Sequence, residues 1–147
     1  MPFHCCSTPL GPGSIILPGN WGRIVGKLGF AHGAALRELV LEDVRAREFP
    51  SLPSRLACAF AIETLEDAIA YRNAAALVSL IYEVDFVDPA ASHHQTDYAL
   101  IAPSGALNLD WARAYWRGSQ AIPSDGRPQR TEILTMSPLR ILARIEA

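Results

Sequence analysis

Residues 57–71 read ACAFAIETLEDAIAY, and this stretch predicts a strand that turns directly into a helix. The small apolar residues at 57–62 suit a buried strand. Thr64 is of a type that caps helices, and Glu66 and Asp67 follow in the first turn, where the helix dipole favours negative charge. We therefore expect a strand over 57–62 and a helix over 64–75.

Further strands and helices flank this unit in mixed order. Strands are expected at 3–7, 14–17, 78–87, 98–102, 132–135 and 139–145, and helices at 34–48 and 109–116. The rest of 10–33, rich in Gly and Pro, and the polar stretch 118–128 are expected to be loops. Because strands and helices do not alternate strictly, the predicted class is α+β.

The helix at 34–48 has apolar residues at helical spacing. Its buried face is expected to hold Leu36, Leu39, Val40 and Val44, with Arg37, Glu38, Asp43 and Arg47 mostly opposite.

The length of 147 residues fits a single domain, 1–147. No apolar run approaches the roughly 18 residues that cross a bilayer, so no membrane association is expected. A net charge of −2 argues against stable binding to duplex nucleic acid. The three cysteines, two of them adjacent, do not form a disulfide framework, and the first residues do not resemble a signal peptide. We therefore expect a cytoplasmic protein with reduced thiols.

Several common site signatures are absent from the sequence: GxGxxG, GxxxxGK[ST], HExxH, GxSxG and CxxC. No metal site is expected, because His93 and His94 are neighbours in a predicted extended stretch and would point to opposite faces. Cys5 and Cys6 beside His4 leave a Cys–His hydrolase as a minor alternative.

Three separated pieces carry residues suited to one chemistry. Phe3 and His4 lie on the first strand, Phe60 and Tyr71 bracket the strand–helix unit, and Glu132 opens a late strand. Two aromatic rings, a histidine and a carboxylate suit a ligand in which a planar cationic ring leaves a sugar.

These pieces resemble the ADP-ribosyltransferase superfamily, particularly its diphtheria-toxin-like branch with a His–Tyr–Glu triad. In that branch an aromatic–His pair ends a first strand, two tyrosines have the spacing of Phe60 and Tyr71, and a later strand presents the acid. The segments LIYEVD at 80–85 and MSPLRILA at 136–143 are similar to strands of the small rifampin ADP-ribosyltransferases. PSR at 53–55 and TLEDA at 64–68 resemble a group of uncharacterised bacterial domains.

The resemblance implies a split β-sheet sandwich with a few flanking helices, and an NAD-dependent mono-ADP-ribosyltransferase with NAD as co-substrate. The implied catalytic residues are Glu132, His4 and Tyr71, and the implied NAD contacts are His4, Ser7, Arg55, Phe60 and Tyr71. Glu132 would bond the ribose 2′-hydroxyl as positive charge grows on the sugar. His4 would hold the other ribose through a ring N–H, Phe60 and Tyr71 would flank the nicotinamide, and Arg55 would contact the pyrophosphate.

Three alternatives remain open. Small members of the superfamily place an aspartate after the central strand, and Asp97 could be that acid instead of Glu132. Arg55 could instead pair with Glu63 or Glu66. The chain could also be a noncatalytic protein of the same fold that binds a nucleotide or a partner. The acceptor of an ADP-ribose group, whether protein, nucleic acid or small molecule, is not identified by the sequence.

Overall fold

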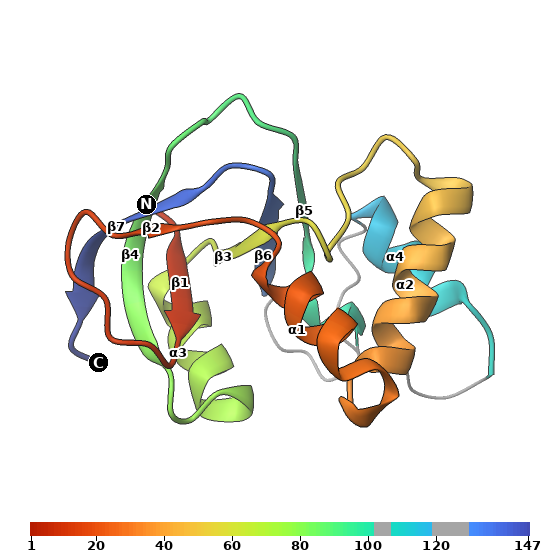
Figure 1. Ribbon diagram of the computed structural model, residues 1–147, viewed down its shortest axis with the longest axis horizontal. Helices are drawn as coiled ribbons and strands as arrows, with labels where there is room; N and C mark the ends of the chain where they lie inside the picture. Colours follow the sequence, from red (N-terminus) through yellow and green to blue (C-terminus); the bar gives the residue numbers. More distant parts are fainter. Residues whose placement is uncertain (102–106, 119–129) are drawn as a thin grey trace.

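The structure is a computed structural model that describes residues 1–101, 107–118 and 130–147. Its strands form one antiparallel sheet in the order β2-β7-β4-β1-β3-β6-β5, with helices packed around it (Figure 1). The elements are β1 (Phe3–Cys6), β2 (Ile15–Ile16), α1 (Asn20–Leu28), η1 (Gly29–Ala31), α2 (Ala35–Glu48), β3 (Ala59–Ile62), α3 (Leu65–Ala75), β4 (Leu80–Phe86), β5 (His93–Asp97), η2 (Tyr98–Ile101), α4 (Asp110–Arg117), β6 (Thr131–Thr135) and β7 (Leu139–Ile145). The α+β class is confirmed.

The sheet has a narrow seam between β1 and β3. The only registered pair across it is Phe3 with Ile62, whereas β1 and β4 are paired at four positions. The split of the sheet that the resemblance implies is therefore not a complete separation. One hydrogen-bonded sheet is present, and its two halves meet at a single residue pair.

The strand–helix unit of β3 and α3 forms as the sequence predicts. Thr64 precedes α3, and its side-chain oxygen accepts a hydrogen bond from the backbone N–H of Asp67 at 3.1 Å. The strands predicted at 3–7, 14–17, 78–87, 132–135 and 139–145 are also present as β1, β2, β4, β6 and β7. The sequence therefore predicts most of the sheet correctly.

Helix α1 lies where a loop was expected, so the prediction for 10–33 is wrong over 20–28. Gly22 is required by close packing, because a Cβ atom there would lie 1.9 Å from the carbonyl oxygen of Leu56. Val25 of the same helix is buried. The glycines that suggested a loop therefore include one that lets a helix approach the neighbouring backbone.

Two further predictions are wrong in detail. Tyr98–Ile101 is a 3-10 helix rather than a strand, and the strand before it is β5. On α2, Leu36 and Leu39 are 65% and 55% exposed, while Glu38 is buried and pairs with Arg55. Most of the loop predicted at 118–128 lies outside the described residues.

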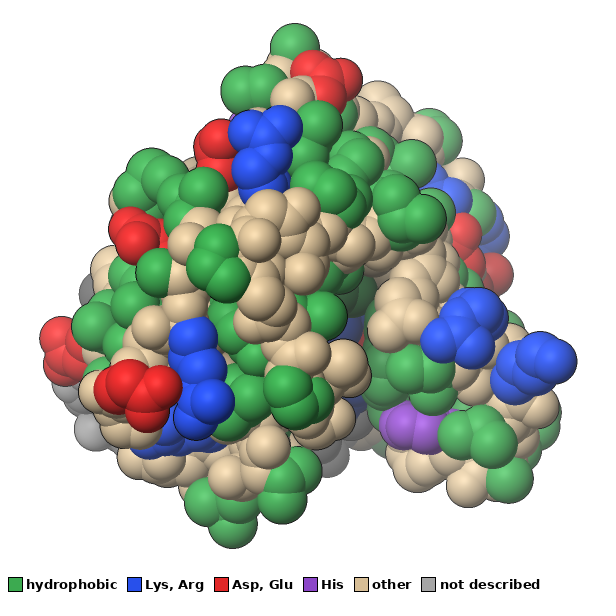
Figure 2. Space-filling view, turned by 60° about the vertical axis from the view of Figure 1, so that its left-hand side comes forward, with side chains coloured by type: hydrophobic (Ala, Val, Ile, Leu, Met, Phe, Trp, Pro, Cys, Tyr) green, Lys and Arg blue, Asp and Glu red, His purple; other side chains and the backbone are tan. Residues whose placement is uncertain are grey.

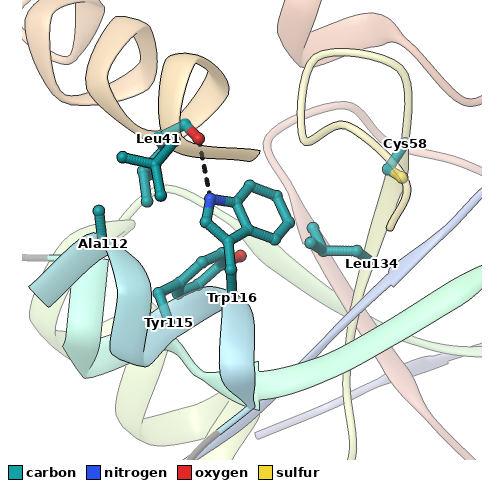
Figure 3. Close-up of a cluster of buried hydrophobic side chains, with 7 residues drawn as sticks. Leu41, Cys58, Ala112, Tyr115, Trp116 and Leu134 are labelled. Atoms are coloured by element: carbon teal, nitrogen blue, oxygen red, sulfur yellow. Dashed lines mark hydrogen bonds between the residues drawn. The ribbon is translucent and has the colours of Figure 1, made fainter. Parts of the chain in front are cut away.

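Helices α2 and α4 lie side by side and cover a hydrophobic core against β6. Trp116 and Tyr115 of α4 are fully buried there, and the indole N–H of Trp116 donates to the carbonyl of Leu41 at 2.8 Å (Figure 3). This contact joins α4 to α2. Within the described ranges, every helix is too short or too polar to cross a bilayer.

Candidate functional site

A pocket of about 560 Å³ opens beside the β1–β3 seam. All four residues of β1 and all four of β3 line it, together with residues of α1, α2, α3 and β6. Figure 2 shows a face of the molecule that is hollowed, with hydrophobic side chains around the recess. The volume is in the range of small-molecule sites, which is typically about 300–1,000 Å³.

Most of the residues singled out from the sequence line this pocket. They are His4, Arg55, Phe60, Tyr71 and Glu132, which come from β1, the segment before β3, β3 itself, α3 and β6.

Two predicted residues are not among the described residues that line the pocket. Ser7 is exposed just after β1, which does not fit its expected contact with NAD. Asp97 is buried at the end of β5, where its carboxylate accepts the backbone N–H of Ala99 at 2.9 Å. The geometry therefore favours Glu132 over Asp97 as the acid that faces a ligand.

His4 bridges the seam. Its Nδ1 lies 2.7 Å from the carbonyl oxygen of Phe60, and since a carbonyl only accepts, Nδ1 carries the hydrogen. Burial lowers the pKa of His4, and the hydrogen bond to Phe60 offsets only part of this effect. At neutral pH the ring is therefore uncharged, and Nε2 is an acceptor. This corrects the expectation that His4 holds a ribose by donating a ring N–H.

Glu132 lies on β6, next to the edge strand β5, and is opposite Ile62 of β3 and Thr96 of β5. Its Oε2 accepts hydrogen bonds from Arg55 Nη1 at 2.8 Å and from the Tyr115 hydroxyl at 2.7 Å. Within the described part of the chain, Oε1 has no hydrogen-bond partner. The carboxylate is thus anchored through one oxygen, while the other remains available to a ligand.

Arg55 is 4% exposed and is held on both sides by carboxylates. Its Nε and Nη2 donate to Glu38 at 3.0–3.2 Å, and Nη1 donates to both Glu132 and the Tyr115 hydroxyl. Burial alone would lower the pKa of Arg55, but the nearby Glu132 and Glu38 raise it well above the ordinary value. The alternative pairing with Glu63 or Glu66 is wrong.

These contacts use the Nε hydrogen, both Nη1 hydrogens and one Nη2 hydrogen of Arg55. Little donor capacity remains for the pyrophosphate that the resemblance assigned to it. Arg55 instead holds Glu132 in place.

Phe60 and Tyr71, the two rings expected to flank the nicotinamide, have different surroundings. Tyr71 packs edge to face against Tyr98, with ring centroids 5.6 Å apart, and burial raises its pKa. The guanidinium of Arg55 lies over the ring of Phe60, 4.9 Å from its centroid. One face of Phe60 is therefore already covered, and Tyr71 is the better placed of the two rings to receive a ligand.

The cysteines do not form an activated nucleophile. Burial raises the pKa of Cys5 to about 11 and that of Cys58 to about 12, and it also raises the pKa of Cys6, so the three thiols are protonated at neutral pH. This disfavours the Cys–His alternative.

The described residues contain no group of three or more His, Cys, Asp or Glu side chains able to hold a metal ion. The imidazole of His94 instead stacks on Trp116 with ring centroids 5.7 Å apart, and its Nε2 lies 3.2 Å from the Tyr115 carbonyl oxygen. His94 is therefore a packing residue of the core.

Several residues of the site were missed from the sequence. Trp21, His32 and Arg37 line the pocket, and Tyr115 anchors Glu132 from behind. Trp21 and His32 lie in the glycine-rich segment that was expected to be a loop. The regular spacing of Trp21, Ile24 and Val25 is the signal that could have revealed the helix.

The fold and the pocket define an α+β protein with a candidate small-molecule site at the seam of its sheet. The chain belongs to the family described as "Protein of unknown function (DUF2441)", whose model matches residues 25–147. The match includes Arg55, Phe60, Tyr71 and Glu132 and begins after His4. No curated protein matches the chain.

Proposed function

We propose that this protein is an NAD-dependent mono-ADP-ribosyltransferase that acts on a protein, a nucleic acid or a small molecule. The observation that carries the proposal is the presence of His4, Tyr71 and Glu132 in one pocket, although they lie far apart in the sequence. These are the residues that match the His–Tyr–Glu triad in the family resemblance. The specific ADP-ribosyltransferase fold belongs to the same proposal, supported by the narrow β1–β3 seam.

The reaction would break the bond between nicotinamide and ribose, and the bonding electrons would leave with nicotinamide. An acceptor nucleophile would then bond to the ribose carbon and lose its proton. Glu132 would accept a hydrogen bond from the ribose 2′-hydroxyl through Oε1 and stabilise the growing positive charge. Such electrostatic stabilisation by one positioned group is worth about 3 kcal/mol.

His4 and Tyr71 would orient the substrate. The Nε2 atom of His4 would accept a hydrogen bond from a ribose hydroxyl, because Nδ1 is held by Phe60. The Tyr71 ring would pack against the nicotinamide. Both groups are attached to regular elements, β1 and α3, which limits the reorganisation needed when the substrate binds.

A second candidate is a noncatalytic protein of the same fold that binds a nucleotide or a partner. The Arg55–Glu132 ion pair favours it, because Arg55 balances the negative charge that the transferase reaction needs. The transferase proposal requires that Oε1 of Glu132, which is not used by Arg55 or Tyr115, still stabilise the positive charge that grows on the ribose.

The test is nicotinamide release from NAD by the purified full chain, measured together with NAD titration. The transferase is expected to bind NAD and release nicotinamide, and a Glu132→Gln variant to bind NAD while losing most of the release. Glu63→Gln, an exposed carboxylate outside the lining, serves as the matched control. NAD binding without release would support the noncatalytic candidate, and no binding would overturn the transferase proposal.

A further inference from the structure

The first 37 residues differ from the rest of the chain in their charge. Every Asp and Glu of the chain lies at position 38 or later, although the net charge of the whole chain is −2. Helix α1 belongs to this acid-free stretch and carries two exposed cations, Arg23 and Lys27. Neither cation forms an ion pair with another described residue. The outer surface of α1 therefore carries positive charge that is open to an anionic partner.

The two cations have a regular spacing. Arg23 and Lys27 are four positions apart, so they are neighbours on the same face of α1. With a rise of 1.5 Å per helical residue, they are about 6 Å apart along the helix axis. This separation is similar to that of neighbouring phosphates along a nucleic-acid strand.

An exposed aromatic ring follows the two cations. Phe30 lies in η1, directly after α1, and is 78% exposed. Proteins that bind single-stranded nucleic acid combine cations, which hold the phosphates, with aromatic rings, on which the bases stack. The surface formed by Arg23, Lys27 and Phe30 has both parts of this combination.

This surface lies beside the candidate site. Nη2 of Arg23 donates a hydrogen bond to Oδ1 of Asn20 at 2.6 Å, and Asn20 lines the pocket. Leu17, which precedes α1, also lines the pocket and is largely exposed. A molecule bound along α1 would therefore lie at the edge of the pocket that contains Tyr71 and Glu132.

We propose that Arg23, Lys27 and Phe30 bind single-stranded nucleic acid and that this strand is the acceptor of ADP-ribose. The inference rests on the proposed function for the transfer itself. A nucleophilic nitrogen or oxygen atom of the nucleic acid would bond to the ribose carbon and lose its proton, and nicotinamide would leave with the electrons of the broken bond. A single strand fits better than a duplex, because its bases are free to stack on Phe30.

The first test is binding of the full chain to a fluorescein-labelled, single-stranded DNA of mixed sequence and about 12 nucleotides, measured by fluorescence anisotropy at several salt concentrations. Arg23→Gln and Lys27→Gln remove one cation each. Phe30→Leu removes the ring but keeps an apolar side chain, and Phe30→Tyr keeps a ring. Arg47→Gln, which removes an exposed cation from α2, is the matched control. Circular dichroism would verify that each variant is folded.

Each of the two α1 cation variants should weaken binding severalfold. Each should also reduce the slope of log affinity against log salt concentration by about 0.7, the value for one phosphate contact in a single strand. Phe30→Leu should weaken binding about fivefold or more, as for the loss of one stacked base. Phe30→Tyr and Arg47→Gln should bind as the unchanged protein does.

Two results would overturn the binding surface. One is the absence of binding by the unchanged protein, or equal affinities in the test and control variants. The other concerns polyglutamate as a second probe. If polyglutamate bound as tightly as the oligonucleotide, and Phe30→Leu weakened neither, the surface would belong to an acidic protein partner instead.

The second test is incubation of the oligonucleotide with NAD and the full chain, followed by mass spectrometry. The oligonucleotide should gain ADP-ribose, and Lys27→Gln and Phe30→Leu should gain less of it on their substrate. Neither residue is in the described lining, so both variants should release nicotinamide to water as the unchanged protein does when no oligonucleotide is present.

Failure of the proposed function would look different from failure of this inference. If the transferase proposal were wrong, the oligonucleotide would bind with the expected variant pattern, yet no nicotinamide would be released from NAD. Release of nicotinamide without any mass added to the bound oligonucleotide would retain the transferase proposal and overturn single-stranded nucleic acid as its acceptor.

Discussion

Two of the ion pairs of helix α2 differ in their surroundings. Near its start, Glu38 is buried and binds Arg55, which in turn binds Glu132. In its second half, Asp43 pairs with Arg47 on the exposed surface of the helix. A buried pair gives up hydration and is strongly destabilising when one partner is removed, whereas an exposed pair contributes little.

The comparison shows which charges are tied to the site. Folding places three charged side chains from α2, the segment before β3 and β6 in one network, and this network ends at the pocket. Asp43 and Arg47 bind only each other among the described residues. The buried network therefore holds Glu132 in place. The effect of removing a charge from it can be compared with the effect of removing one from the exposed Asp43–Arg47 pair.

Removing the centre of the buried network should have the largest effect. Arg55→Met leaves Glu132 buried without its cation and leaves Glu38 with Arg37 alone. The free energy of unfolding should fall by about 3–5 kcal/mol, as found when one partner of a buried pair is removed. Urea denaturation measures this change, and a loss below about 1 kcal/mol would mean that the network is not a stabilising unit.

A smaller loss should follow from removing only the hydroxyl of Tyr115. That hydroxyl accepts from Arg55 and donates to Glu132, while its ring is packed in the core. Tyr115→Phe should lower the free energy of unfolding by about 1–2 kcal/mol, because the ion pair remains. If Tyr115→Phe proved as damaging as Arg55→Met in the same denaturation experiment, the hydroxyl rather than the charge would be the dominant element.

Acidification should weaken the fold at His4, because burial disfavours the charged form of its ring. Burial lowers the pKa of His4 in the folded state, so the unfolded chain binds more protons below the ordinary histidine value of about 6.5. Stability should therefore be complete above that pH and decline as the pH falls toward the folded-state pKa. Denaturation at pH 7 and pH 5 would reveal this slope.

His94, whose pKa burial also lowers, contributes in the same direction. His4→Gln should therefore reduce the slope without abolishing it. An unchanged slope in His4→Gln would assign the pH dependence to other groups.

The exposed pair should give the smallest effect. Arg47→Met removes a cation whose partner in the described part of the chain is Asp43, and water replaces the interaction. Its unfolding midpoint in urea should match that of the unchanged protein at moderate ionic strength. A loss comparable to that of Arg55→Met would remove the distinction between the two pairs.

The sequence predicts the parts of this molecule that depend on local signals. The Thr64 cap, the β-branched strand β4 and the strand that carries Glu132 are all present, and His4, Tyr71 and Glu132 share a pocket. The eleven-residue spacing of Phe60 and Tyr71 places both on the pocket lining, although Phe60 is covered by Arg55.

The features that the sequence does not predict depend on long-range contacts. From the sequence alone, Gly22 suggests a loop. The structure shows that Gly22 lies in a helix and leaves room for the backbone of Leu56. Glu38 has the spacing of a solvated residue, because nothing near it in the sequence indicates that Arg55 will lie beside it. The true partners of Arg55, Glu38 and Glu132, are 17 and 77 positions away.

The most direct test compares the two acids. Nicotinamide release from NAD should be measured for the unchanged protein, Glu132→Gln and Asp97→Asn, each verified as folded. Glu132 has a free oxygen in the pocket, and Asp97 is buried outside its described lining. We predict a loss of about 100-fold or more in Glu132→Gln, as for removal of one group that stabilises transition-state charge, with Asp97→Asn retaining most of its activity. Near-normal release by Glu132→Gln beside a large loss in Asp97→Asn would contradict this account.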